Sequence, residues 1–107
     1  MIIKSKDTKI KKIGVMNINE YKINSEYSGA LIKINGKHGK MKSLNEDRIY
    51  FVIEGDGKFI INDKESEVGV NDMIVVPKNT PYDIIGKMKY LLICSPEFNP
   101  INDKNLE

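Results

Sequence analysis

The sequence predicts an all-β domain, and three observations favour this class. Helical periodicity is nearly absent from the chain. The apolar residues instead form short runs that are rich in β-branched and aromatic side chains. Glycine, asparagine, aspartate and proline separate these runs at nearly regular intervals. Many short strands in such an arrangement are typical of a β-sandwich or a β-barrel.

Eight strands are expected, in chain order, over residues 9–15, 30–34, 48–54, 58–61, 66–68, 73–76, 82–85 and 89–94. Gly55 and Gly57 of "EGDG" can adopt positive φ, so this stretch is expected to be a hairpin turn. Asn62 and Asp63 are expected to form a second hairpin tip. The two prolines of "PKNTP" cannot lie inside a hydrogen-bonded ladder, so residues 77–81 are expected to form a loop.

The length of 107 residues fits a single domain, residues 1–107, with a core at about 28–96. An N-terminal strand precedes this core and an extended C-terminal tail follows it. Phe98 is expected to pin the tail, which is expected to fray beyond that point.

Composition excludes several classes of partner. Apolar residues make up 40% and charged residues 30%, which is typical of a soluble globular protein. The 17 basic residues are scattered among 15 acidic ones, so no nucleic acid partner is expected. Cys94 has no second cysteine to pair with and is expected to be a small buried hydrophobe in a reducing compartment.

The first residues lack the apolar core of a signal peptide, and no apolar run is long enough to cross a bilayer. We therefore expect a cytoplasmic protein without a membrane partner.

Two segments, "RIYFVIEGDGKFIIND" and "VGVNDMIVVPKNTPYDI", together resemble the cupin superfamily. The resemblance covers about residues 32–96. It implies a double-stranded β-helix, which is a jelly-roll barrel with its site inside the mouth.

The resemblance also locates the family's metal-ligand positions, and none of them carries the expected ligand here. The glutamate position falls on Arg48, and the histidine position of the second motif falls on Tyr82. The two histidine positions of the first motif fall on Met41 and Ser43, or on Lys42 and Leu44. A guanidinium group would repel a metal ion at short range, so no metal and no cofactor are expected. One alternative is a displaced metal site formed by His38, Glu46 and Tyr82.

Alternation along the strands predicts which side chains face the barrel interior. If Arg48 faces inward, Tyr50 and Val52 share that face, and Tyr82 and Ile84 do so on their own strand. An apolar pocket with a few polar groups is typical of small-molecule sites, so Arg48, Tyr50 and Tyr82 are predicted to bind a ligand. The guanidinium group is expected in a solvated mouth, where it would prefer an anion or a polyol.

Each of these residues also has a purely structural interpretation. Arg48 could be an ion-pair residue at the rim, with Glu46, Asp47 or Glu54 as its partner. Tyr50 and Tyr82 could be core aromatics. His38 lies in the polar stretch "NGKHGK", where a solvated loop histidine is the default expectation.

The resemblance and the pocket together lead to the hypothesis of a metal-independent cupin that binds a small polar molecule, either a sugar or a carboxylate. An alternative is a metal-free sugar isomerase or epimerase. Some cupins that act on sugar nucleotides work in this way, and here His38 would be the base and Tyr82 or Tyr50 the acid. A further alternative is a structural or regulatory dimer with a filled barrel.

A homodimer is predicted in each case. Ile49, Phe51 and Ile53 alternate with the inward residues and form a face that is too apolar for solvent. Either the N-terminal strand or a second subunit must cover this face.

Overall fold

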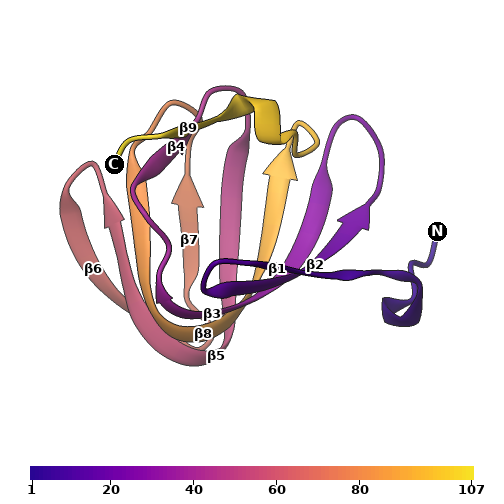
Figure 1. Ribbon diagram of the computed structural model, residues 1–107, viewed down its shortest axis with the longest axis horizontal. Coiled ribbons are helices and arrows are strands. Elements are labelled where there is room, and N and C mark those ends of the chain that lie inside the picture. The colour runs from indigo at the N-terminus through magenta and orange to yellow at the C-terminus, as the bar shows by residue number, and fades with distance from the viewer.

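The computed structural model describes residues 1–107, and its nine antiparallel strands form one strongly curled sheet (Figure 1). The strands are β1 (Ile10–Ile13), β2 (Met16–Lys22), β3 (Ser28–Lys37), β4 (Met41–Ser43), β5 (Asp47–Ile61), β6 (Lys64–Gly69), β7 (Met73–Val76), β8 (Tyr82–Ser95) and β9 (Asp103–Asn105). Two 3-10 helices of three residues each, η1 (Ser5–Asp7) and η2 (Pro100–Asn102), lie near the two ends of the chain. None of the helices has the length or the apolar character that a membrane-spanning helix needs.

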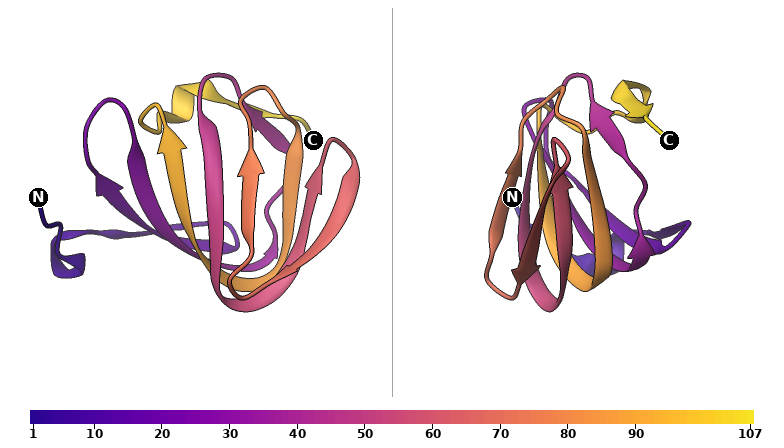
Figure 2. Two further views of the ribbon diagram at one scale, coloured as in Figure 1. Left: turned by 180° about the vertical axis from the view of Figure 1, so that it is seen from behind. Right: turned by 90° about the vertical axis from the view of Figure 1, so that its left-hand side faces the viewer.

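The two longest strands, β5 and β8, form the centre of the sheet. They pair along their whole length, from Asp47 opposite Ser95 to Ile61 opposite Tyr82. The first half of β5 also pairs with β7 and the second half with β6, whereas β8 leads through β3 and β2 to β1. Figures 1 and 2 show β3, β5 and β8 bending together at one end, so that the sheet folds over itself. The result is the predicted all-β jelly-roll barrel.

The predicted hairpin turn at "EGDG" is wrong, because this segment is a bend within β5. A β-bulge lies between Val52 and Glu54, and pairing with β8 continues on both sides of it. Gly55 has a φ of 78°, and a Cβ atom there would lie 2.1 Å from the carbonyl oxygen of Lys87. Glycine therefore allows β5 and β8 to bend while they remain in close contact. Each of these two strands takes the place of two shorter predicted strands.

Other predicted elements agree with the structure more closely. Asn62 and Asp63, with φ of 50° and 63°, form the tip between β5 and β6. Strand β7 has the predicted bounds, and residues 77–81 form a loop. The predicted strand 9–15 is shorter, because the chain turns at Gly14 and continues as β2, which pattern reasoning missed.

The expectation that the C-terminal tail frays is wrong. After η2, the strand β9 pairs with β4, with Lys104 opposite Lys42. The last residue is also fixed, since the carboxylate of Glu107 accepts a hydrogen bond from the backbone N–H of Lys40 at 2.5 Å. The tail therefore closes one side of the barrel mouth.

The inner face of the sheet holds the core, and strand alternation predicts it well. Arg48, Tyr50 and Val52 are 4%, 1% and 0% exposed, and Tyr82 and Ile84 are equally buried. Cys94 is buried, as expected. Asp83 alternates with the inward Tyr82 and Ile84 and is nevertheless buried, and its carboxylate accepts a hydrogen bond from the backbone N–H of Gly39 at 2.9 Å.

Candidate functional site

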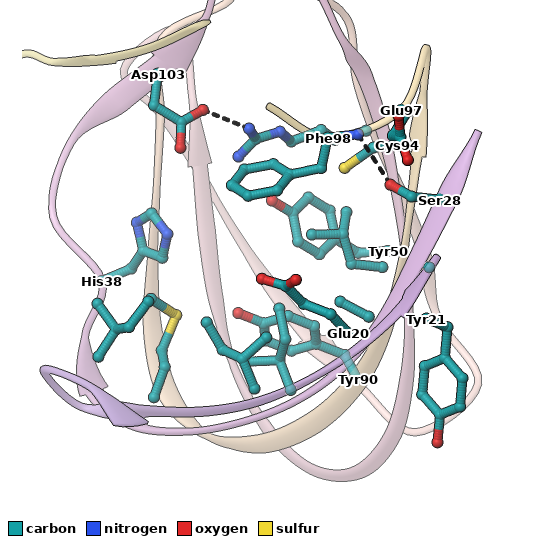
Figure 3. A pocket seen from close by; sticks show the side chains of 18 of the residues that line it. Glu20, Tyr21, Ser28, His38, Tyr50, Tyr90, Cys94, Glu97, Phe98 and Asp103 are labelled. Carbon is teal, nitrogen blue, oxygen red and sulfur yellow. Dashed lines mark hydrogen bonds and ion pairs between the residues drawn. The ribbon is translucent and has the colours of Figure 1, made fainter. Parts of the chain in front are cut away.

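The barrel mouth contains a cavity of about 300 Å³ (Figure 3). Its walls come from the inner faces of β2, β3, β5 and β8 and from the C-terminal segment around Phe98 and Asp103. Twelve of the 20 lining residues are hydrophobic, as in typical small-molecule pockets. The barrel is therefore not filled, and the hypothesis of a dimer with a filled barrel is wrong on this point.

Arg48 lines the cavity. The sequence had led us to expect its guanidinium group in a solvated mouth, but the group is buried. Its Nη1 donates to the Tyr82 hydroxyl at 2.8 Å. Its Nη2 donates to the carboxylates of Glu46 at 3.0 Å and Asp103 at 2.5 Å. The guanidinium carbon also lies 5.5 Å from the centre of the Phe98 ring. Arg48 thus forms ion pairs, as one structural interpretation proposed, although in the interior and not at the rim.

The two carboxylates offset the positive charge of Arg48. Glu46 is 0% exposed, and its second oxygen accepts hydrogen bonds from the backbone N–H of Asn99 and the side-chain amide of Asn102, at 3.3 and 2.9 Å. Burial raises the pKa of the Asp103 carboxyl, and the neighbouring guanidinium opposes this rise. Because one cation faces two carboxyl groups, the geometry does not favour the anionic ligand that the arginine alone suggests.

A transition-metal ion fits neither the family's ligand positions, where Arg48 replaces the glutamate, nor the alternative site of displaced ligands. Both oxygens of Glu46 are already bound to Arg48, Asn99 and Asn102, and Glu46 does not line the cavity that His38 lines. The alternative site of His38, Glu46 and Tyr82 would therefore place the ion beside a guanidinium group. No cluster of three or more histidine, cysteine, aspartate or glutamate residues in the chain could hold a metal ion.

Tyr50 and Tyr82 form a hydrogen-bonded pair on β5 and β8. Their hydroxyl oxygens are 2.8 Å apart, and both side chains are buried. Burial raises the pKa of both phenols, although the positive charge of Arg48 opposes this rise. Both hydroxyls are therefore protonated at neutral pH. Tyr50 lines the cavity, and Tyr82 connects it to Arg48.

His38 is not a solvated loop residue, because its ring is half-buried and lines the cavity (Figure 3). It follows the end of β3, where its backbone N–H donates to the carbonyl of Ile84 at 2.8 Å. The centre of its ring lies 5.8 Å from that of Tyr82. Its Nδ1 lies 2.8 Å from the carbonyl oxygen of Gly39, which can only accept a hydrogen bond. This contact places the proton on Nδ1 and leaves Nε2 free to act as a base.

The structure thus brings together His38, Tyr50 and Tyr82, which are separate in the sequence. Sequence reasoning missed Asp103 and Tyr90 as residues of the cavity wall. It also missed the contact between Phe98 and Arg48. Tyr90 was accessible to prediction, because it alternates with Leu92 and Cys94 on one strand. No local signal connects Asp103 to Arg48, which lies 55 residues earlier in the chain.

Comparison with known proteins was made in sequence and in structure. No family model matches this chain. An uncharacterized protein of Methanocaldococcus jannaschii, MJ1618, is 29% identical over 83 residues, which are 75% of this chain and 66% of that protein. The match therefore spans slightly less than two thirds of the relative.

Pac13 of Streptomyces, a nucleoside dehydratase, superposes with a TM-score of 0.94 and 19% identity over 100% of this chain and 91% of its own. KdgF from Halomonas superposes with a TM-score of 0.85 and 11% identity, over 94% and 97% of the two chains. The fold is a cupin fold. Other structures of Pac13 contain uridine, in variants that replace a tyrosine by phenylalanine or a histidine by glutamine.

Proposed function

We propose that this cupin is a metal-independent enzyme that binds a small, sugar-containing molecule and transfers protons between His38 and the Tyr50–Tyr82 pair. One observation carries the proposal: a single cavity is lined both by a histidine with a free Nε2 and by a phenol at the end of a hydrogen-bonded chain from Arg48. A general base and a general acid that share one small cavity are the minimum equipment for such chemistry.

His38 is suited to the role of base. The enzyme hypothesis needs a group that orients the imidazole. The carbonyl of Gly39 performs this function, because its oxygen lies 2.8 Å from Nδ1 and accepts a hydrogen bond from it. Nε2 can then take a proton from a carbon atom of the substrate. Histidine removes such a proton most readily next to a carbonyl group, where the resulting negative charge is delocalised.

The tyrosine pair is suited to the role of acid. Either hydroxyl can donate in their shared hydrogen bond, so when Tyr82 donates to Tyr50, the Tyr50 proton is free to point into the cavity. The proton can then pass to a substrate oxygen, and the guanidinium of Arg48 stabilises the negative charge that develops on the pair. In a dehydration the leaving hydroxyl takes this proton and departs as water. In an isomerisation no C–O bond breaks, and the proton returns to the substrate.

The comparisons support a sugar-containing substrate. Pac13 is a nucleoside dehydratase, and the side chains replaced in its variants with uridine are of the types that meet in this cavity, a histidine and tyrosines. The apolar wall of the cavity also supports a ligand that has a ring in addition to a polar sugar. A nucleoside is therefore the first substrate class to test, before free sugars and sugar acids.

Proton exchange in D₂O, followed by NMR, tests the proposed reaction. The substrates are keto and aldehydo sugars, and nucleosides oxidised to a carbonyl in the ribose. We expect deuterium to enter at the carbon next to that carbonyl, or water to be lost, at a rate that a chelator does not change. A ligand that binds by calorimetry without exchange or reaction would favour the binding-only hypothesis instead. An activity that chelation removes and a divalent metal restores would contradict metal independence.

We also propose that the protein is a homodimer formed through the outer face of β5, β7 and β8. Ile49 and Ile53 are 38% and 37% exposed, and the N-terminal strand β1 pairs with β2 and not with these strands. The outward residues form two rows across the three strands, Val75–Ile49–Ile93 and Met73–Phe51–Leu91. These rows contain no charged side chain, and a second copy related by a twofold axis could pack against them as one sheet on another.

Sedimentation at micromolar concentration is expected to give twice the chain mass of 12.2 kDa. Replacing Phe51 by lysine at the centre of this face should yield a folded monomer, because the charge would be buried between the two sheets. Val70→Lys is a matched control, since Val70 is 54% exposed and lies outside these two rows. A wild-type protein that sediments as a monomer at high micromolar concentration would contradict the dimer.

A further inference from the structure

The hydroxyl of Tyr90 is a polar group for which the chain provides no partner. Tyr90 lies on β8 between Ile32 and Val52 of the neighbouring strands and is 0% exposed. Its ring packs edge-on against Tyr50, with ring centres 5.2 Å apart, and against Phe59 at 6.3 Å. The hydroxyl, however, forms no hydrogen bond within the protein. Tyr90 lines the cavity in which His38 and Tyr50 lie (Figure 3).

A buried hydroxyl without a partner is unfavourable, and most such groups in proteins are satisfied. A phenylalanine would fill the same space without this disadvantage, so ring packing does not explain why the residue is a tyrosine. Burial also raises the pKa of the Tyr90 phenol far above its ordinary value, so the group remains a hydrogen-bond donor at any physiological pH.

The surroundings of Tyr90 indicate what kind of acceptor would reach it. The neighbouring walls are apolar and include Ile18, Ile32 and Leu92. A polyol placed there would lose several hydrogen bonds to water and regain few. The carboxylate of Glu20 also lines the cavity and forms an ion pair with Lys11 at 3.1 Å, so this wall offers no free positive charge to an anionic group. An uncharged and largely apolar ring that carries an acceptor oxygen or nitrogen fits both conditions.

We propose that the Tyr90 hydroxyl donates a hydrogen bond to an acceptor on the ring portion of the ligand, and so determines specificity for nucleoside-like molecules over free sugars. This inference rests on the proposed function, because it needs a sugar-containing ligand in the same cavity. His38 and Tyr50 act on the sugar, and Tyr90 recognises the ring attached to it. Tyr90 is a binding residue in this scheme and takes no part in the proton transfer.

Calorimetry with two probes, uridine and methyl β-riboside, tests the inference. The two probes share the sugar and differ in the ring. We expect Tyr90→Phe to weaken uridine binding by about tenfold, the loss of one hydrogen bond, and to change methyl riboside binding by less than about twofold. The melting temperature of the free protein should stay the same or rise, because the variant removes an unsatisfied polar group. Tyr27→Phe, at a tyrosine that is 42% exposed and outside the cavity, is the matched control and should leave every value unchanged.

The possible failures are distinguishable. Equal affinity of wild type and Tyr90→Phe for uridine would overturn the role of Tyr90 alone and leave the proposed function intact. A fall of several degrees in the melting temperature, with equal losses for both probes, would mean that the hydroxyl is structural and would also overturn it. If the wild type binds neither probe nor any other nucleoside, the role of Tyr90 is wrong. Binding of a free sugar or a sugar acid would then leave the proposed function intact, and binding of none of these would overturn the proposed function as well.

Discussion

Replacement of His38 by glutamine is expected to lower the rate of proton transfer by a factor of about 10² to 10⁴, the usual contribution of a general base. Glutamine is similar in size and can hydrogen-bond, but it cannot accept a proton from carbon. The effect should appear in kcat, and ligand affinity should change little, because the imidazole acts on the reacting carbon and does not hold the rest of the ligand. The measurement is deuterium exchange at the substrate carbon, together with calorimetry of the same variant.

Two further variants make this result specific. Tyr50→Phe removes the proposed acid at the cavity wall and should also lower the rate, whereas Tyr27→Phe lies outside the cavity and should not. A wild-type exchange rate in His38→Gln would exclude the histidine as the base. In that case the nearby carboxyl of Asp103 would be the next candidate, because it lines the same cavity.

Replacement of Arg48 by methionine is expected to lower the free energy of unfolding by about 3–5 kcal/mol, the range for breaking a buried ion pair at one partner. Glu46 is 0% exposed and would lose the cation that compensates its charge. The Tyr82 hydroxyl and Asp103 would each lose a hydrogen bond as well. Urea unfolding of the variant measures the difference.

The same experiment has an internal test and a control. Adding Glu46→Gln to Arg48→Met should recover part of the loss, because the amide leaves no unpaired charge in the interior. Lys58→Met breaks an exposed ion pair with Glu65, 3.2 Å long, and should change stability by no more than about 1 kcal/mol. A loss as small as this for Arg48→Met would show that the buried cluster does not stabilise the fold. The position expected from the sequence, a guanidinium group in a solvated mouth, would give only such a small loss of stability.

The face toward which each strand residue points could be predicted from the sequence alone. Strand side chains alternate with a period of two, and this local rule places Arg48, Tyr50 and Val52 inside and Ile49 and Ile53 outside, as the structure has them. The tip at Asn62 and Asp63 is equally local, because these residue types tolerate positive φ. The all-β class follows from the same short-range patterns.

The tertiary structure alone decided whether "EGDG" reverses the chain or bends it. Glycines permit both conformations, and β8 selects the bend because it continues to pair with β5 on both sides of Gly55. The electrostatic character of the site was decided in the same way. Arg48 read alone suggests an anion site, but Asp103, 55 residues later, and the buried Glu46 offset its charge. His38 joins the cavity only because β3 and β8 are paired beside it, and such contacts between distant residues leave no trace in local sequence patterns.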